Sequence, residues 1–398
     1  MAHYRYLIVG GGMTAASAVR GIRGIDADGS IGLLSQEGNP PYDRPPLSKG
    51  LWKGKPEEKI WRKVDFPGVD LLLGRTAVSV EPGKKEVSDN RGSVYTYDKL
   101  LLATGGTPRR LPFGEGEILY YRTLDDYKNL RREVEKDFHF GVIGGGFIGS
   151  EIAAALNMQG APVTMLFPEA GISALAFPAD LSKFVSDYYR ARGVDVLSGE
   201  AVAGLEHHNG RLELITGSGQ TVQVDRVIAG IGIRPNVEIA QQAGLAVENG
   251  VVVDGTLRTS QLDIYAAGDV ANFYNPLLDK RLRVEHEDNA NTMGRTAGRN
   301  MAAVQTASAE PEEYAHLPYF YSDLFDLGYE AVGELNASLE VVEDWIETPY
   351  KKGVVYYLNE GRVRGVLLWN VWKKLDEARA LIGEKGPFSA KDLKGRIL

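Results

Sequence analysis

One pattern of apolar positions repeats along the chain: a short apolar run, a glycine-rich turn and an alanine-rich stretch occur twice. The first copy begins with Tyr6–Val9 and the second with Phe138–Ile143, and further apolar runs follow at Ile31–Leu34 and Val163–Phe167. Runs of this length predict buried strands, and the longer stretches between them predict helices. The pattern therefore predicts two βαβ units, as in α/β proteins with parallel sheets.

The repeat extends beyond these units, because each is followed by short meander strands and then by a closing apolar run. Meander strands are predicted at residues 69–80, 86–97, 193–202, 211–216 and 222–229. The closing runs are Leu100–Ala103 and Val227–Ile231, and each leads to a glycine. A further run, Ile264–Ala267, has no counterpart after the second unit, which predicts that the chain returns to its first domain.

The pattern changes after residue 318, where short β-like runs precede a helical pattern at Val371–Ile382. We therefore predict three domains in the chain. The first is discontinuous and consists of residues 1–112 and 240–317, the second consists of residues 113–239, and the third is a C-terminal α+β domain at residues 318–398.

Composition narrows the function classes. The 398 residues are enough for two or three domains at about 150 residues each. The 53 acidic and 45 basic residues give a net charge of −8, which argues against a nucleic-acid or anionic-membrane binder. Hydrophobic residues make up 43% and charged residues 25%, as in a folded globular protein.

The sequence contains no cysteine, which excludes disulfides, a thiolate nucleophile, cysteine-held iron–sulfur clusters and cysteine-ligated zinc. No apolar run approaches the ~20 residues of a membrane span. The chain reaches its first predicted strand without a charged and apolar leader. These observations predict a cytoplasmic enzyme without a membrane span.

The two glycine turns have the spacing of dinucleotide-binding sites, in which backbone N–H groups and a helix N-terminus face a pyrophosphate. The small residues at the three required positions are Gly10, Gly12 and Ala15 in the first turn and Gly144, Gly146 and Gly149 in the second. An acidic residue about 20 positions later binds the ribose in such sites. Glu169 follows Gly149 by 20 residues, and Glu37 follows Ala15 by 22, with Gln36 as an alternative.

A single turn of this kind can be a plain glycine turn, but two turns with their acids inside a repeat favour two nucleotide sites. No Arg or Lys lies between Val163 and Ser173, where the 2′-phosphate of NADPH would require one. The second site is therefore predicted to prefer NADH over NADPH.

The segment Pro41–Lys49 resembles the flavin loop of FAD-dependent pyridine-nucleotide oxidoreductases of the ferredoxin reductase and apoptosis-inducing factor type. The two glycine turns, residues 100–108, 232–236 and 266–271 match the same family in the same order. Three sets of segments look most like prokaryotic apoptosis-inducing factor-like proteins: residues 166–169, then 284–286 with 294–300, then 353–358 with 368–370.

The resemblance implies a glutathione reductase-like α/β fold with two Rossmann-like domains and a C-terminal α+β domain that covers the flavin. It implies FAD in the domain of residues 1–112 and 240–317 and NADH in the domain of residues 113–239. Lys49 is then expected near the flavin, where a fixed cation stabilises added negative charge. The resemblance pairs it with Glu151, which also contacts the nicotinamide; the alternatives are an exposed loop lysine and a glutamate that complements the helix dipole.

Other site residues are also implied by the resemblance. Phe147 is either a gate over the flavin or a packing residue, and Tyr321 stands where relatives commonly have tryptophan. His286 stands near a position where ferredoxin reductases usually have tryptophan. The expected FAD contacts are Arg44, Thr104, Gly105, Arg109, Gly268, Asp269, Glu285 and His286, and Ile148 and Gly232 complete the set of expected cofactor contacts. The acidic cluster around His286 lacks the ligand spacing of a metal site, so none is predicted.

Without cysteine, electrons must leave the flavin directly for an external acceptor, such as a small iron–sulfur protein, a quinone, a small oxidant or oxygen. Residues 361–398 contain nine Lys or Arg against four Asp or Glu, which would steer in an acidic ferredoxin unless these lysines lie on solvated helix faces. Three hypotheses stay open: an apoptosis-inducing factor-like NADH oxidoreductase, a ferredoxin or rubredoxin reductase, and an interaction protein whose homodimer responds to NADH.

Overall fold

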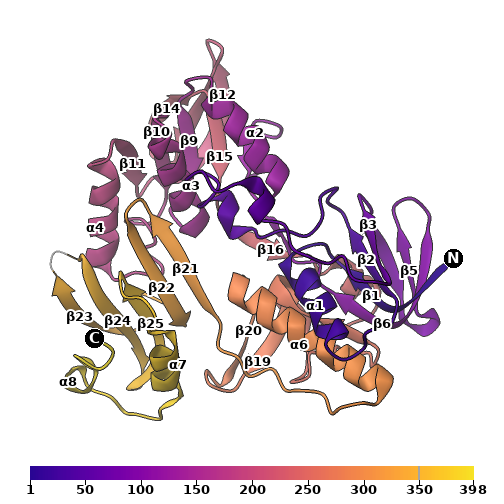
Figure 1. Cartoon of the computed structure of the whole chain (residues 1–398). Helices are drawn as coiled ribbons and strands as arrows, with labels where there is room; N and C mark the ends of the chain where they lie inside the picture. The colour runs from indigo at the N-terminus through magenta and orange to yellow at the C-terminus, as the bar shows by residue number, and fades with distance from the viewer. Residues whose placement is uncertain (348–349) are drawn as a thin grey trace. The chain divides into compact units, whose positions relative to one another are not determined.

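The computed structural model describes residues 1–347 and 350–398, and these divide into two compact units (Figure 1). Unit 1 contains residues 1–44, 56–107 and 234–318, and unit 2 contains residues 45–55, 108–233 and 319–398. The chain passes between the units at the short strands β7 (Gly106–Pro108) and β16 (Ile233–Pro235). The division into three domains stays a prediction.

Unit 1 is built on a sheet whose parallel strands follow the order β3-β2-β1-β6, with β18 added in parallel on β6. The strands β5 and β4 continue from β6 in antiparallel fashion. The bounds are β1 (Ala2–Val9), β2 (Ile31–Ser35), β3 (Val69–Leu73), β4 (Ala77–Glu81), β5 (Glu86–Asp89), β6 (Val94–Leu102) and β18 (Ile264–Ala266). The segments 6–9 of β1, 31–34 of β2 and 100–102 of β6 are apolar and buried, as is typical of parallel strands with both faces covered.

The predicted meander strand at residues 69–80 is two separate strands. Gly74, with φ +64°, ends β3, which pairs in parallel with β2, while β4 pairs in antiparallel fashion with β5. The remaining elements of unit 1 are short turns and strands around the sheet. They are η2 (Glu57–Lys59), η3 (Pro82–Lys84), α5 (Glu238–Gln242), β17 (Val251–Val252), η4 (Gly268–Val270), β19 (Ala271–Asn275) and β20 (Lys280–Leu282).

Two helices of unit 1, α1 (Met13–Arg23) and α6 (Glu287–Thr306), pack closely against each other (Figure 1). Glycines on α6 permit this approach. A Cβ at Gly294 would lie 2.4 Å from the carbonyl oxygen of Thr14, and one at Gly298 would lie 2.2 Å from that of Ala18. The backbone of α6 therefore rests on the first turns of α1, the helix that follows the first glycine turn.

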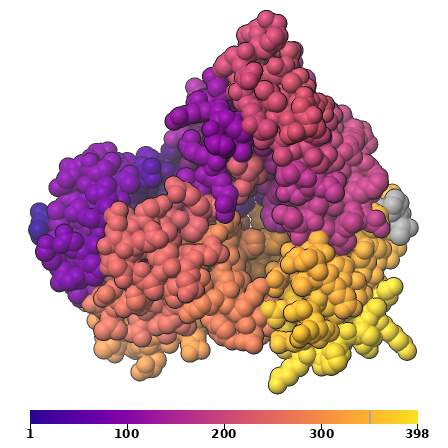
Figure 2. Space-filling model, turned by 180° about the vertical axis from the view of Figure 1, so that it is seen from behind, coloured from indigo at the N-terminus to yellow at the C-terminus, as the bar shows by residue number. Residues whose placement is uncertain are grey.

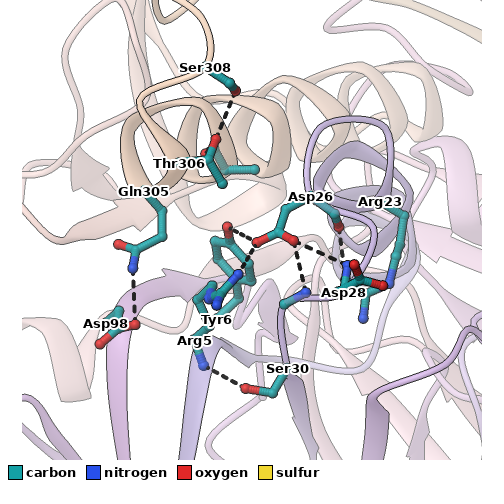
Figure 3. A network of polar contacts seen from close by, with 12 residues as sticks. Arg5, Tyr6, Arg23, Asp26, Asp28, Ser30, Asp98, Gln305, Thr306 and Ser308 are labelled. Atoms are coloured by element: carbon teal, nitrogen blue, oxygen red, sulfur yellow. Dashed lines mark hydrogen bonds and ion pairs between the residues drawn. The ribbon is translucent and has the colours of Figure 1, made fainter.

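A polar network lies at the opposite end of β1 from that turn (Figure 3). Asp26 is buried and accepts hydrogen bonds from Arg5, from the Tyr6 hydroxyl and from the backbone N–H of Gly29, each at 2.8 Å. Burial opposes ionisation of Asp26, but these donors outweigh it and lower its pKa to about 2. The carboxylate therefore anchors the connection between α1 and β2.

Unit 2 contains a second parallel sheet, with strand order β11-β10-β9-β15-β8, and a small antiparallel sheet, β12-β13-β14. The bounds are β8 (Ile118–Tyr120), α2 (Leu124–Val134), β9 (Phe140–Ile143), α3 (Phe147–Met158), β10 (Val163–Phe167), α4 (Ala179–Arg190), β11 (Val194–Ser198), β12 (Val202–His208), β13 (Arg211–Thr216), β14 (Thr221–Val224) and β15 (Arg226–Ala229). The turn between β12 and β13 is exposed and forms the rose-coloured tip in Figure 2.

The C-terminal part of unit 2 is an antiparallel sheet in the order β21-β22-β25-β24-β23, against which the helix α7 packs. The bounds are β21 (Tyr319–Leu324), β22 (Leu327–Gly333), β23 (Glu340–Glu347), β24 (Lys352–Asn359), β25 (Arg362–Trp369), α7 (Leu375–Gly383) and α8 (Ala390–Leu393). The helix that the sequence predicts from Val371 begins only at Leu375, because Asn370 and Lys373 adopt positive φ angles that a helix does not allow.

Candidate functional site

The first glycine turn, in unit 1, has the geometry that a pyrophosphate requires. Gly10 follows β1 with φ +132°, and a Cβ there would lie 2.1 Å from the carbonyl oxygen of Ala103. Gly12 caps α1 in an extended conformation, and a Cβ there would meet no atom within 4 Å. Ala15 is buried in the first turn of the helix. The turn therefore leaves the helix N-terminus open to a phosphate group.

The acid of the first site is held by two neighbours. Glu37 accepts a hydrogen bond from the Tyr42 hydroxyl at 2.6 Å and pairs with Arg44 at 2.5 Å. Burial opposes the charge on Arg44, but Tyr42 and Glu37 outweigh it and raise the pKa of the guanidinium. Gln36, the alternative, is exposed. The structure thus joins the acid after β2 to the segment that resembles a flavin loop.

The closing strand of unit 1 ends in a turn that is fixed from a distant part of the sequence. The Thr104 hydroxyl donates to the carbonyl oxygen of Asn236 at 2.8 Å, and the Asn236 side-chain amide donates to the carbonyl oxygen of Thr104 at 2.9 Å. Gly105 adopts φ +64°. Asn236, which holds this turn from a distant segment, was not among the predicted site residues.

Two further segments of unit 1, the turn at Asp269 and the residues Glu285 and His286 before α6, are connected through Arg283. Gly268 has φ +78°, and a Cβ there would lie 2.2 Å from the Thr14 hydroxyl oxygen, so only glycine fits beside α1. Arg283 donates to the carbonyl oxygen of Asp269 at 3.0 Å and pairs with Glu285 at 2.6 Å. Burial lowers the pKa of His286 to about 4, although Asp269 and Asp288 oppose the shift. The imidazole is therefore neutral at pH 7.

The second glycine turn, in unit 2, repeats the geometry of the first. Gly144 has φ +115°, and a Cβ there would lie 2.5 Å from the carbonyl oxygen of Gly230. A Cβ at Gly149 would lie 2.0 Å from the carbonyl oxygen of Gly144, whereas one at Gly146 would meet no atom within 4 Å. The exposed Ile148 follows Phe147 in the first turn of α3. Two sites of one design therefore exist, one in each unit.

The acid of the second site, Glu169, differs from Glu37 of the first in its hydrogen bonding. Within residues 1–347 and 350–398, no side chain donates a hydrogen bond to the Glu169 carboxylate. The backbone of Glu169 is held by the N–H of Gly199 at 2.9 Å. Elsewhere in unit 2, the N–H of Arg109 donates to the carbonyl oxygen of Gly232 at 2.9 Å, and the Arg109 side chain is exposed.

A buried ion pair in unit 2 joins Lys49 to Glu151. The Lys49 Nζ lies 2.7 Å from the Glu151 Oε2, and the two side chains are only 11% and 2% exposed. The Ser48 hydroxyl donates to the same oxygen at 2.5 Å, and the Ser322 hydroxyl donates to Oε1 at 2.5 Å. Lys49 is therefore a paired, buried cation rather than an exposed loop lysine.

Aromatic side chains surround this ion pair. The Lys49 Nζ lies 5.3 Å from the centre of the Tyr321 ring, within the range of a cation–π contact. Phe147 packs on Phe320 at 5.0 Å and on Tyr329 at 6.4 Å between ring centres. The Phe147 ring therefore lies against two aromatic rings of the C-terminal sheet. Burial, reinforced by the charge of Glu151, raises the pKa of the Tyr329 hydroxyl well above its usual value.

The predicted residues thus gather in two places. Those of the first glycine turn and the expected FAD contacts other than Arg109 lie in unit 1, while Lys49, the second glycine turn and Tyr321 lie in unit 2. The sequence analysis missed Ser48 and Ser322. The only signal for them is their position next to Lys49 and Tyr321 in the chain.

Residues 1–347 and 350–398 offer neither a metal site nor a membrane-spanning helix. They contain no group of three or more His, Cys, Asp or Glu that could hold a metal ion. None of their helices is long and apolar enough to cross a membrane.

Two sites of this design define a flavin- and nicotinamide-dependent oxidoreductase, and comparison with known proteins gives the family. Residues 4–310 match the pyridine nucleotide-disulphide oxidoreductase family, so the chain belongs to it. Residues 344–384 match the C-terminal domain described as "Apoptosis-inducing factor, mitochondrion-associated, C-term".

Individual relatives within this family are apoptosis-inducing factors and ferredoxin reductases. Apoptosis-inducing factor 1, mitochondrial, of Dictyostelium discoideum is 35% identical over 95% of this chain and 78% of its own length. Putidaredoxin reductase CamA of Pseudomonas putida is 32% identical over 96% of this chain and 92% of its own. The crystal structure of the covalent putidaredoxin reductase–putidaredoxin complex has a chain that matches with a TM-score of 0.88 at 30% identity, over 98% of this chain and 95% of that one.

These findings confirm the predicted fold class, two Rossmann-like dinucleotide-binding domains with a C-terminal α+β domain. They also confirm the resemblance and the cofactors: the protein is an FAD-dependent NAD(P)H oxidoreductase of the ferredoxin reductase and apoptosis-inducing factor type. It passes electrons from FAD to an external acceptor without a cysteine relay, because the sequence contains no cysteine.

Proposed function

We propose that this protein oxidises NADH at unit 2 and that the buried Lys49–Glu151 pair is the centre of that reaction. The observation that carries the proposal is the position of Glu151 in α3, two residues after Gly149 of the second glycine turn, where it pairs with Lys49. The pyrophosphate of a dinucleotide bound at this turn lies at the N-terminus of the same helix.

In this proposal unit 1 binds FAD. The turn at Gly10 and Gly12 faces the pyrophosphate, Glu37 and Arg44 bind the ribose and phosphate, and Asp269 binds the ribityl chain. The open position at Gly12 and the positive φ at Gly268 support this fit, because a side chain at Gly12 would obstruct a ligand and one at Gly268 would clash with the Thr14 side chain. FAD supplies, when bound, the two-electron chemistry that amino-acid side chains lack.

The residues of unit 2 have distinct roles. Lys49 holds a fixed positive charge that stabilises the reduced state of the flavin. Glu151 keeps that charge in place and binds the carboxamide of the nicotinamide. Tyr321 packs on Lys49 and limits the positions of its ammonium group. We assign Phe147 to packing that holds the glycine turn, since its ring contacts Phe320 and Tyr329.

The neutral His286 belongs to the FAD site of unit 1. An imidazole that stays uncharged at pH 7 adds no positive charge to the site, so its part is a hydrogen bond or a packing contact rather than charge stabilisation. Glu285 is paired with Arg283 and keeps this loop in place.

We propose that NADH is preferred over NADPH. Within the described residues, no side chain donates a hydrogen bond to the Glu169 carboxylate. Such an acid accepts hydrogen bonds from the two hydroxyls of the NADH ribose. The 2′-phosphate of NADPH would instead meet this negative charge, and no Arg or Lys lies between residues 163 and 173 to neutralise it.

The acceptor follows from the relatives and the charge. The solved complex of putidaredoxin reductase contains putidaredoxin, and residues 361–398 of this chain are basic. A small acidic iron–sulfur protein is therefore the acceptor that we propose for the reductase reading. The alternative that we keep is the one implied by the resemblance to apoptosis-inducing factor-like proteins, whose C-terminal domain residues 344–384 match: a slow acceptor and a homodimer that responds to NADH. A cytoplasmic location is proposed with both.

A rapid-mixing experiment tests the central role of Lys49. Purified holoprotein is mixed with NADH without oxygen, and flavin reduction is followed in the visible range. Lys49→Ala should retain FAD yet be reduced at least about 10-fold more slowly, because a preorganised charge is worth several kcal/mol. Lys49→Arg keeps the charge and should recover part of the rate. A Lys49→Ala protein that is reduced at the normal rate would reject the role.

The same experiment separates the acceptor hypotheses. Air is admitted after reduction. A long-wavelength charge-transfer band that survives air would indicate a shielded complex with NAD and favour the apoptosis-inducing factor-like reading. Immediate reoxidation without the band would favour an open flavin and a fast iron–sulfur acceptor. Light scattering with and without NADH then measures the mass of the protein in solution. An unchanged mass would reject the hypothesis of a homodimer that responds to NADH.

A further inference from the structure

The Glu151 carboxylate is held by three donors that come from two separate segments of unit 2. Ser48 and Lys49 donate to Oε2 from the segment of residues 45–55. Ser322 donates to Oε1 from β21 in the C-terminal sheet, at 2.5 Å. The three contacts therefore connect both of these segments to α3 at Glu151, close to the N-terminal end of the helix.

Among residues 1–347 and 350–398, Ser322 is the only residue whose side chain donates a hydrogen bond to Oε1 of this carboxylate. A carboxylate with both donors on one oxygen can still rotate about its terminal bond, whereas donors on both oxygens fix its plane. Ser322 is 1% exposed, so water does not replace its hydroxyl. The plane of the carboxylate in turn sets the position of Oε2, the atom that the Lys49 Nζ contacts at 2.7 Å.

The position of Ser322 is itself well determined. It pairs with Tyr329 of β22 in the antiparallel register, and its neighbour Tyr321 contacts the Lys49 ammonium group from the same strand. One strand therefore places both a hydroxyl on Glu151 and a ring beside Lys49. A serine that merely satisfied a buried acceptor would need no such second contact from its neighbour.

We propose that Ser322 is a positioning residue for the oxidation of NADH, acting through Glu151 on Lys49. The inference rests on the proposed function of the Lys49–Glu151 pair. It assigns to the C-terminal sheet a part in the reaction of the second nucleotide site, beyond covering a cofactor.

The test compares Ser322→Ala with Ser322→Thr, which keeps the hydroxyl, by anaerobic stopped-flow reduction of the FAD-loaded protein over a range of NADH concentrations. Ser322→Ala should lower the limiting rate of flavin reduction about 10-fold, since small misplacements of a reacting group reduce rates strongly. The Kd for NADH should change less than about two-fold, because Glu169 and the glycine turn are untouched. Ser322→Thr should recover most of the rate.

The matched control is Thr164→Val, which removes a buried hydroxyl in unit 2 that contacts His139 and not Glu151. Its rate should be that of the wild type. FAD content and melting temperature are measured for every variant, so that a folding defect is seen directly. An equal loss of rate in Thr164→Val and Ser322→Ala would overturn the inference.

A double-mutant cycle separates this inference from the proposed function. In a Glu151→Ala background, Ser322→Ala should slow reduction no further, because no carboxylate remains to be positioned. An equal slowing in both backgrounds would overturn the role of Ser322. A normal rate in Ser322→Ala with a slow Glu151→Ala would overturn it as well, and leave the proposed function standing. A normal rate in Glu151→Ala alone would overturn the proposed function.

Discussion

A methyl group added at Gly146 should separate nucleotide binding from stability. Gly146 caps α3 with φ −79° and ψ −169°, an extended conformation that alanine adopts without strain. A Cβ there would meet no protein atom within 4 Å. Replacing glycine by alanine at a helix N-cap costs less than about 1 kcal/mol. The melting temperature of Gly146→Ala should therefore fall by no more than about 2–4 °C.

Binding should respond differently, because the open space at Gly146 is where the pyrophosphate of NADH approaches the backbone. Hydrogen bonds to charged groups contribute about 1.5–3 kcal/mol each. Losing one of them raises Kd about 10- to 150-fold at 1.4 kcal/mol per factor of ten. We therefore expect Gly146→Ala to require at least 10-fold more NADH for half-maximal flavin reduction, with its FAD content unchanged.

Gly149→Ala provides the contrast, since its Cβ would lie 2.0 Å from the carbonyl oxygen of Gly144. Overpacking of this kind costs about 1–3 kcal/mol, so this variant should lose both stability and NADH affinity. Gly12→Ala, the equivalent open position in unit 1, should lower FAD retention instead. If Gly146→Ala melts normally and also binds NADH with normal affinity, the pyrophosphate does not lie at this turn and the reasoning is refuted.

Two further predictions concern acids at other places in the chain. Asp26→Asn should destabilise the protein by about 2 kcal/mol at pH 7, which is the value of a pKa lowered from 3.8 to about 2. That stability is present above pH 4 and is lost as the pH falls toward 2, so melting at pH 7 and pH 3 compared with exposed Asp28→Asn checks it; an equal loss in both variants would contradict it. Glu169→Ala should raise the Kd for NADH about 10-fold through loss of charged hydrogen bonds. Its melting temperature and FAD content should not change, and an unchanged ratio of NADH to NADPH affinity would count against the assignment.

The local parts of both nucleotide sites can be predicted from the sequence. Strand, glycine turn and helix are neighbours in the chain, so their apolar runs and small residues carry the whole signal. The spacing that identifies Gly149 reflects a contact with Gly144 only five residues away, which any parallel βαβ unit reproduces. The acid Glu169 is equally predictable, because the length of one helix and one strand fixes its distance from the turn.

Contacts between segments far apart in the chain depend on the tertiary structure. Asn236 fixes the turn at Thr104 from 132 residues away, and although both segments match the family pattern, nothing in the sequence shows that these two residues bond to each other. The choice between a gate and a packing role for Phe147 is likewise open in the sequence. Its contacts with Phe320 and Tyr329 favour packing. These contacts exist only once the C-terminal sheet has formed beside α3, so the sequence does not reveal them.

The sequence by itself determined that two dinucleotide turns exist, that each has an acid at the right distance, and that no thiol can relay electrons. The tertiary structure decided how Glu151 is held, because Ser322 reaches it across 171 residues of chain. The physical reason is the range of the interactions. Backbone geometry and helix ends act over a few residues and are visible as spacing, whereas a buried carboxylate is satisfied by whichever donors the folded chain brings to it.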